Sequence, residues 1–576
     1  FRLPGEVSGA GDQPIQLQNE GFQPMSDNTT VYMARRIVTL DDNCPSATHV
    51  AVRNGRILAV GDETDVYKWG EAKTDNRFQD CVLTPGFVEG HAHVLEGVVW
   101  GDMHYVGYFP RRAPDGTYHA GLKSIDEVVE RLKEAEAEMD DANAALIAWG
   151  FDPIYFDGRR MTRQDLDAVS TTRPILVIHA NFHLLNVNTR VLTLANVGPD
   201  TPVEGILRDS NGKPTGELQE MAAKFMAFRA VGRNLFSDTL QESEIRRYGQ
   251  SARRAGVTTI TDLLSSLDEA NFDCYQRVTS EPDFPVRVVP ALAAMMWDTS
   301  AGIDRLREIQ SRGNEKLRLG LVKIMTDGSI QGFTGRLNWP GYFNGARNGI
   351  WNAPPAELKR MISAYHEAGF PVHIHANGDQ ASELAIDALQ EALEAKPRAD
   401  HRHTIQHCQM AERAQFQRMR ALGIGVNLFA NHVFYWGDQH HDLTLGPDRA
   451  ARINAAATAL QESVPFALHS DAPVTPLSPL FTAWCAVNRE TATGRILGES
   501  QCITPEQAIR AVTLGAAWSI GMDGEIGSIE VGKYADFAVL EEDPLAVEPG
   551  RIRDIRVIDT VIDGKASSDS NPPRLQ

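Results

Sequence analysis

Pro85-Gly-Phe-Val-Glu-Gly-His91-Ala-His93 places two histidines at the end of a short extended run. Residues 82–84 end an extended run, 87–88 are apolar, and Pro85-Gly86 bends the chain between them. Residues two apart on a strand point to the same side, so the imidazoles of His91 and His93 can converge on one point. This stretch therefore predicts a metal site at the end of a strand.

Seven further apolar segments with strand character follow this stretch, and helical segments separate them. The strands are expected at 257–262, 286–292, 319–325, 371–375, 403–407, 423–428 and 465–469. Helices are expected between them, for example at 356–368 and 382–393. Strand–helix alternation repeated eight times predicts an α/β protein with a parallel (β/α)8 TIM barrel.

The two ends of the chain are rich in β-strand patterns. Strands are expected at 32–40, 49–53, 56–60, 535–540 and 555–562, and Asn54-Gly55 is a strong hairpin turn signal. We expect residues 25–84 and 520–567 to build one composite β-sandwich domain, with the barrel at 85–519. Residues 1–24 are rich in Gly, Pro and Gln and are interpreted as a disordered arm or an upstream remnant.

The interval between His93 and Val257 is far longer than an ordinary strand–helix connection. It predicts an insertion subdomain at 100–250, in which Ser124-Ile-Asp-Glu127 opens a helix with a capping box. Because the insertion follows the first barrel strand, it should cover the carboxyl-terminal face of the barrel, where such enzymes hold their substrate.

The composition of the 576 residues is that of a globular protein, with 42% hydrophobic and 23% charged residues. The formal charge of −20 and the lack of a basic stripe argue against a nucleic-acid or anionic-membrane partner. No apolar run reaches the roughly 18 residues of a membrane span. The six cysteines are scattered without a C-x-x-C pair, so we expect a reduced, cytoplasmic protein.

Residues that can bind a metal recur where these apolar strands meet a turn. His91 and His93 end the first strand, and four more such positions follow: Lys323, His375, His407 and Asp471. Since all strands of a parallel barrel end on one face, these side chains should meet there.

In these motifs the chain resembles the amidohydrolase superfamily, and within it the YtcJ-like branch related to N-substituted formamide deformylase. The resemblance covers nearly the whole chain from about residue 25. It rests on the stretch quoted above, 322–329, 375–379, 403–407, 470–473 and the closing 527–536. Two positions differ from the family pattern: Phe182 stands where relatives have Gly before His183, and Gln406 where they usually have Glu.

The resemblance implies a ligand set for one or two divalent metal ions. His91 and His93 would bind one ion, His375 and His407 a second, and Asp471 would also be a ligand. Lys323 would bridge the ions as an N-carboxylated lysine. Nitrogen and oxygen ligands without thiolates favour zinc, with manganese or iron as alternatives.

The implied reaction is hydrolysis of a carbon–nitrogen amide bond in a small molecule. A metal-activated water attacks the carbonyl, and Asp471 takes the water proton and passes it to the leaving nitrogen. His183 is the candidate to stabilise the oxyanion, and Trp149 and His432 are candidate substrate contacts. Hydrolysis of a cyclic imide, carbamate or ester is the alternative reaction, and a metal-binding regulatory scaffold without catalysis is the alternative class. Relatives commonly form homodimers.

Overall fold

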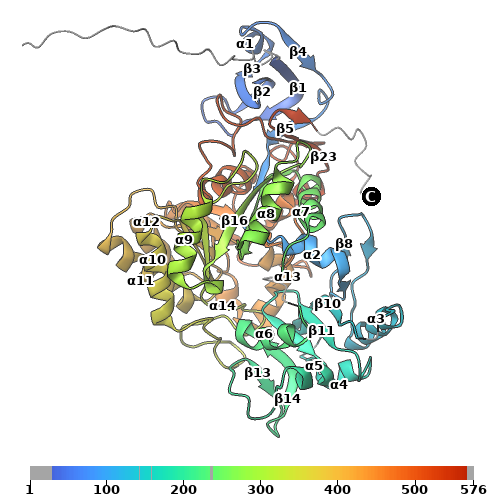
Figure 1. Cartoon of the computed structure of the whole chain (residues 1–576). Coiled ribbons are helices and arrows are strands. Elements are labelled where there is room, and N and C mark those ends of the chain that lie inside the picture. The colour runs from blue at the N-terminus through green and yellow to red at the C-terminus, as the bar shows by residue number, and fades with distance from the viewer. Residues whose placement is uncertain (1–28, 142, 157, 234–237, 567–576) are drawn as a thin grey trace, which may run out of the picture.

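The computed structural model describes residues 29–141, 143–156, 158–233 and 238–566, so the segment 1–24 lies outside the described residues. The described chain forms three large sheets. Figure 1 shows the sheet of the chain ends at one pole, the parallel sheet with its helices in the middle, and the sheet of the insertion at the opposite pole.

The central sheet has eight parallel strands in the order β21-β20-β19-β18-β17-β16-β15-β6. Neighbours in this order follow one another along the chain, with β6 at one edge, which is the arrangement of a TIM-type barrel. The mixed α/β class and the TIM-like arrangement are therefore confirmed. The strands are β6 (Phe87–Glu89), β15 (Val257–Ser265), β16 (Arg287–Ala293), β17 (Leu321–Met325), β18 (Val372–Ala376), β19 (Thr404–His407), β20 (Gly425–Leu428) and β21 (Phe466–Leu468).

Amphipathic helices separate these strands and pack their apolar faces on the sheet. Apolar strand residues and helix residues such as Leu358 and Ile386 belong to one buried cluster, so the helices cover the sheet as the alternating pattern predicts. The helices are α8 (Glu269–Thr279), α9 (Thr299–Ile309), α10 (Pro355–Glu367), α11 (Asp379–Ala395), α12 (Arg413–Leu422), α13 (Asn431–Gln439), α14 (Pro447–Ala450), α15 (Ala456–Gln461), α16 (Pro479–Asn488), α17 (Pro505–Arg510) and α18 (Ala516–Ser519).

The two edges of the parallel sheet meet just beyond β6 and β21. Asp471 N donates to His91 O at 3.1 Å, and His93 N donates to Ala472 O at 2.9 Å. Residues of the predicted metal site thus supply the backbone link between the first and last barrel strands.

Strands from both chain ends share one sheet, in the order β24-β23-β22-β5-β1-β2-β3, with β4 paired to β1. The predicted turn at Asn54-Gly55 joins β2 to β3 with φ values of 53° and 74°, the left-handed conformation that such two-residue hairpins require. The elements are β1 (Thr29–Val38), β2 (Ser46–Arg53), β3 (Arg56–Gly61), α1 (Glu63–Tyr67), β4 (Ala72–Asp75), β5 (Val82–Pro85), β22 (Phe537–Leu540), β23 (Val557–Ile562) and β24 (Lys565–Ala566).

The long interval between β6 and β15 carries its own mixed sheet, in the order β13-β14-β12-β11-β10-β7. Ser124 caps α3 by accepting a hydrogen bond from Glu127 N at 3.1 Å, as the sequence predicts. The other half of the predicted capping box differs, because the Glu127 carboxylate accepts from Lys123 N at 2.7 Å. The elements are α2 (Leu95–Asp102), β7 (His104–Tyr105), β8 (Arg111–Arg112), β9 (Tyr118–His119), α3 (Ile125–Ala137), β10 (Leu146–Phe151), α4 (Arg163–Asp167), β11 (Ile175–His179), β12 (Leu184–Val187), α5 (Thr189–Leu194), β13 (Ile206–Arg208), β14 (Pro214–Gln219), α6 (Glu220–Ala230) and α7 (Glu242–Arg254).

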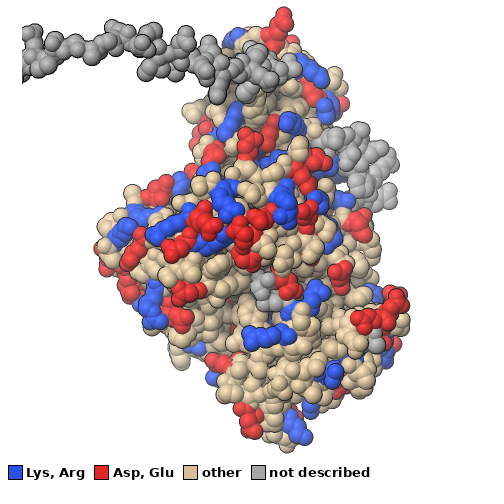
Figure 2. All heavy atoms as spheres, viewed as in Figure 1, with Lys and Arg blue, Asp and Glu red and all other residues tan. Residues whose placement is uncertain are grey.

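Acidic and basic side chains are interspersed over the barrel helices on the face shown in Figure 2. Arg312, for example, lies 2.8 Å from Glu269. Among the described residues, no helix combines the length and apolar character needed to cross a membrane.

Candidate metal and active site

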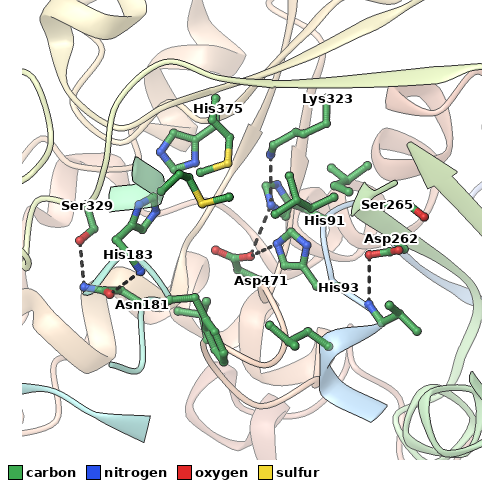
Figure 3. Close-up of a pocket in the computed structure, with 18 of the residues that line it drawn as sticks. His91, His93, Asn181, His183, Asp262, Ser265, Lys323, Ser329, His375 and Asp471 are labelled. Carbon is green, nitrogen blue, oxygen red and sulfur yellow. Dashed lines mark hydrogen bonds and ion pairs between the residues drawn. The ribbon is translucent and has the colours of Figure 1, made fainter. Parts of the chain in front are cut away.

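One cavity brings together most of the residues singled out in the sequence. It lies between the barrel and the insertion, and the space without protein atoms there, including the open solvent at its mouth, is about 1020 Å³. The predicted residues that line it are His91, His93, His183, Lys323, His375, His407, His432 and Asp471, most of which are labelled in Figure 3. The barrel residues come from β17, β18 and β19 and from the segments after β6, β20 and β21, so the carboxyl ends of the strands form the floor of the cavity.

Asp471 lies at the centre of the candidate metal cluster. Its Oδ1 is 3.2 Å from His93 Nε2 and 3.4 Å from His91 Nε2, and its Oδ2 is 3.9 Å from His407 Nδ1. Oδ1 is buried and has no hydrogen-bond partner. A buried carboxylate oxygen without a donor, facing imidazole nitrogens, has the donor atoms and spacing that suit a divalent cation.

The second pair of histidines lies beside the first. The ring of His375 is 4.5 Å from that of His407, which is itself 4.5 Å from that of His91. His375 Nε2 lies 3.3 Å from Gly328 O, and a carbonyl can only accept a hydrogen bond. Asn377 Nδ2 lies at the same distance from His375 Nε2, so the polar contacts of the ring gather at Nε2 and leave Nδ1 as the nitrogen available to a metal.

Burial sets the charge of this cluster. It lowers the pKa of His91, His375 and His407 well below the usual value, with nearby cationic and imidazole groups adding to the effect. The imidazoles are thus neutral, the form in which histidine binds a metal. Burial also lowers the pKa of Lys323 to about 7, although Asp471 opposes this shift.

The backbone is held in an uncommon conformation at two of these positions. His407 has a φ of 66° and Asp471 a φ of 55°, values in the left-handed region that side chains with a Cβ rarely adopt. Such strain costs about 1–3 kcal/mol per residue and persists where the surrounding structure enforces it, most often at functional sites.

Glu89 also belongs to the site, although the sequence patterns did not single it out. Its carboxylate accepts hydrogen bonds from Ser470 Oγ at 2.7 Å, Ser470 N at 3.2 Å and His91 N at 3.2 Å. Burial raises its pKa to about 8, which these hydrogen bonds oppose. Glu89 thereby joins the first strand to the segment that carries Asp471. Glu89 stands two residues before His91 in the stretch quoted first, and this position could have identified it as a site residue.

The insertion contributes a polar wall opposite the barrel. His183 Nδ1 lies 3.0 Å from Glu220 Oε2, and the His183 ring lies 5.2 Å from that of His375. Burial opposes the charge of Glu220, but His183 and Lys224 hold its pKa below its usual value. Burial lowers the pKa of Lys224 to about 8. Glu220 and Lys224 had no signal in the sequence, because they lie on a helix whose contacts with the cavity depend on the fold of the insertion.

The two remaining candidates for substrate contact lie in different places. His432, on α13, lines the cavity and packs its ring 4.2 Å from that of Phe429. Trp149 lies instead in the core of the insertion and lines a second, smaller cavity together with Trp436. The stretch that contains Trp149 still reaches the barrel, because Trp436 Nε1 donates to Asp152 Oδ2 at 2.9 Å.

Comparisons with known proteins agree with this fold. Residues 79–567 match the model of the Amidohydrolase family, so the chain belongs to that family. It is 27% identical to YtcJ of Bacillus subtilis (strain 168) over 90% of this chain and 95% of that protein. It is also 27% identical to the N-substituted formamide deformylase of Arthrobacter pascens, over 91% and 96% of the two chains.

A solved structure shows the same fold. An uncharacterized metal-dependent hydrolase from Pyrococcus horikoshii OT3 superimposes with a TM-score of 0.68 at 21% identity, over 91% of this chain and 99% of that one. The family match and the relatives over nearly the full length confirm the predicted resemblance. The chain is an enzyme of the amidohydrolase family.

Proposed function

We propose that this enzyme hydrolyses an amide, N-acyl or formamide bond of a small molecule with the help of one or two divalent metal ions. Zinc is the metal that the ligand set favours. The observation that carries the proposal is the buried, unpaired Oδ1 of Asp471 among neutral imidazoles at the ends of the barrel strands. The residues that would hold the metal are His91, His93, Lys323, His375, His407 and Asp471. The relative named as an N-substituted formamide deformylase supports the choice of a carbon–nitrogen bond.

A bound metal would supply a water molecule that ionises near neutral pH and would polarise the carbonyl of the substrate. Asp471 is the group placed to take the proton of the attacking water. It then returns this proton to the nitrogen as the carbon–nitrogen bond breaks, so that the amine leaves neutral.

His183 is the second group with a role in this proposal. Glu220 accepts from Nδ1 of His183, which orients the ring and leaves Nε2 as its other hydrogen-bonding atom. Because Nδ1 already donates to Glu220, Nε2 can donate as well only in the imidazolium form, and in that form it would stabilise the negative charge that develops on the carbonyl oxygen. His432 is proposed to contact the substrate from α13. Trp149 is proposed to contribute to substrate binding from the neighbouring small cavity, which it lines.

Lys323 enters the proposal as a carboxylated lysine. Its amine is buried, and its lowered pKa of about 7 makes the neutral, nucleophilic form accessible at physiological pH. Nζ would attack carbon dioxide, forming a C–N bond and releasing one proton, and the carbamate would carry the negative charge that two cations require. The ammonium form of Lys323 can donate to anions but has no lone pair with which to bind a cation.

The proposal keeps the domain boundaries predicted from the sequence. In this proposal residues 25–84 with 520–567 form the composite β-sandwich domain, 85–519 the barrel and 100–250 the insertion that covers the substrate. A homodimer and a cytoplasmic location stay predictions. A cyclic imide, carbamate or ester remains the alternative substrate, because the same site would act on any of these carbonyls.

Metal content tests the proposal directly. Elemental analysis of protein prepared without chelator should give one to two metal ions per chain, and a screen of N-substituted formamides and simple amides should reveal turnover. Lys323→Met should lower the metal content. Lys224→Met is the matched control, since Lys224 is also a buried lysine at the cavity but lies on the insertion wall. Wild-type protein that binds no zinc after reconstitution would refute the proposal.

A further inference from the structure

A line of hydrogen bonds runs from His91 into the barrel interior, away from the cavity. His91 Nδ1 lies 2.7 Å from Gln406 Oε1, and Gln406 Nε2 lies 2.7 Å from His373 Nδ1. His373 Nε2 lies 2.9 Å from the backbone carbonyl of Ser519. The three side chains are almost completely buried, at 0–1% exposure. We call His91, Gln406, His373 and the Ser519 carbonyl the Gln406 relay.

The carbonyl at its end fixes every proton in the Gln406 relay. Ser519 O can only accept, so the proton of a neutral, buried His373 is on Nε2 and its Nδ1 is an acceptor. Gln406 must then turn its NH₂ group towards His373, which leaves Oε1 towards His91. Since Oε1 can only accept, His91 carries its proton on Nδ1 and its lone pair on Nε2.

The nitrogen selected in this way is the one that faces the candidate metal cluster. His91 Nε2 lies 3.4 Å from Asp471 Oδ1 and 3.4 Å from Lys323 Nζ. In the opposite tautomer Nε2 would carry a proton and could not bind a cation. The direction of a hydrogen bond at Ser519, outside the cavity, therefore decides whether His91 offers a lone pair to the site.

We propose that Gln406 is a positioning residue that fixes the tautomer and ring orientation of His91 for metal binding. An amide suits this place because the relay needs one acceptor, towards His91, and one donor, towards His373. A carboxylate would supply two acceptors, and an apolar side chain would supply neither. The role towards a metal rests on the proposed function, whereas the tautomer of His91 is a property of the metal-free protein.

The contacts of His407 Nδ1 show how a line of hydrogen bonds behaves when it does not end in a backbone carbonyl. His407 Nδ1 lies 3.1 Å from His469 Nε2, and His469 Nδ1 lies 3.1 Å from Asn427 Oδ1. This second line ends in a side-chain amide, whose oxygen and nitrogen can exchange places by rotation. It is therefore compatible with either tautomer of His407, whereas the Gln406 relay is compatible with one tautomer of His91.

The tautomer can be measured on metal-free protein labelled with ¹⁵N in histidine, because long-range ¹H–¹⁵N spectra distinguish an Nδ1 proton from an Nε2 proton. The His91 signals are assigned from their loss in His91→Gln. We expect Nδ1–H on His91 and Nε2–H on His373 in the wild type. In Gln406→Leu, His91 should become a mixture of tautomers, and zinc affinity, measured by chelator competition, should fall about 10–100-fold.

Two further variants separate this role from a general packing role. Gln406→Glu should keep Nδ1–H on His91 and most of the zinc affinity, because one carboxylate oxygen still accepts from His91. Gln409→Leu is the matched control, because Gln409 is equally buried and its Nε2 lies 3.0 Å from Nε2 of a different histidine, His440. It should leave the tautomer of His91 unchanged and zinc affinity within about twofold of the wild type.

Three results would overturn the inference: Nε2–H on His91 in the wild type, an unchanged His91 tautomer in Gln406→Leu, or equal losses of zinc affinity in Gln406→Leu and Gln409→Leu. Failure of the proposed function is recognised separately, as wild-type protein that takes up no zinc while His91 still shows Nδ1–H.

Discussion

Arg287 joins the barrel to the sheet of the chain ends, and its replacement by Met tests how the two are held together. Arg287 lies on β16 and is 1% exposed. Its Nε donates to Asp536 Oδ2 at 3.0 Å and its Nη2 to Asp536 Oδ1 at 3.3 Å, and Nη2 also pairs with Asp563. The guanidinium lies 3.7 Å from the ring centre of Tyr534. Asp536, Asp563 and Tyr534 all come from the carboxyl-terminal end of the chain.

The expected loss of unfolding free energy follows from the carboxylates that Arg287→Met leaves without a counter-ion. The side chain of Asp536 is 3% exposed, so removal of Arg287 leaves its carboxylate buried without a counter-ion. Breaking a buried ion pair in this way costs about 3–5 kcal/mol. Arg287→Met combined with Asp536→Asn should recover part of this loss, because the uncompensated charge is then gone.

The same reasoning predicts how the stability loss caused by Arg287→Met depends on pH. Burial raises the pKa of Asp536, and Arg287 opposes that rise, so the variant should raise it further. A carboxyl group whose folded-state pKa exceeds its unfolded-state value destabilises the protein when it is charged, and this penalty disappears as the pH falls and the group is protonated. The loss caused by Arg287→Met should therefore be larger at pH 8 than at pH 5.

Urea unfolding followed by tryptophan fluorescence, with midpoints and slopes compared at both pH values, measures these effects. A loss of unfolding free energy below about 1 kcal/mol is typical of exposed ion pairs, and it would refute the stabilising role assigned to Arg287. A double variant no more stable than Arg287→Met, or a loss that does not change with pH, would refute the role assigned to the buried charge of Asp536.

Two further predictions concern histidines. His183→Asn should lower kcat about 100–1000-fold with little change in KM, because an oxyanion donor acts mainly in the transition state; steady-state kinetics on an amide found in the screen check this, and an effect confined to KM would contradict it. His403 is fully buried, its Nδ1 accepts from Val372 N at 3.0 Å, and burial lowers its pKa well below the usual value. The unfolded chain takes up a proton at His403 below about pH 6.5 and the folded protein does not, so stability is lost as the pH falls, by up to about 1.4 kcal/mol per pH unit. His403→Gln should flatten the acid side of the stability profile measured by urea unfolding, and an identical slope in wild type and variant would show that His403 is not a neutral group there.

Local sequence patterns were enough to place the strands of the barrel, although not the sheet of the insertion. All strands expected in the barrel have counterparts in the structure, with boundaries that differ by a few residues, as between the expected 319–325 and β17 at Leu321–Met325. The hairpin at Asn54-Gly55 and the cap at Ser124 were also predictable. Alternation, turn residues and caps act between neighbours in the chain, so they can be recognised without the fold. The side chains that end the strands were predictable for the same reason, because the geometry of parallel strands collects them on one face.

Only the tertiary structure decided which groups surround those side chains. The hydrogen bond between His91 and Gln406 joins residues 315 positions apart, and Glu220 reaches His183 because α6 packs over the barrel mouth. Trp149, in a stretch that looked like cavity lining, lies in the core of the insertion. Such contacts depend on how helices and sheets pack and on which rotamers that packing allows, and no local pattern records either. The sequence by itself determined the metal-binding residue types and the strands that carry them, and the packing of the folded chain determined the protonation, the strain and the supporting contacts that prepare them for chemistry.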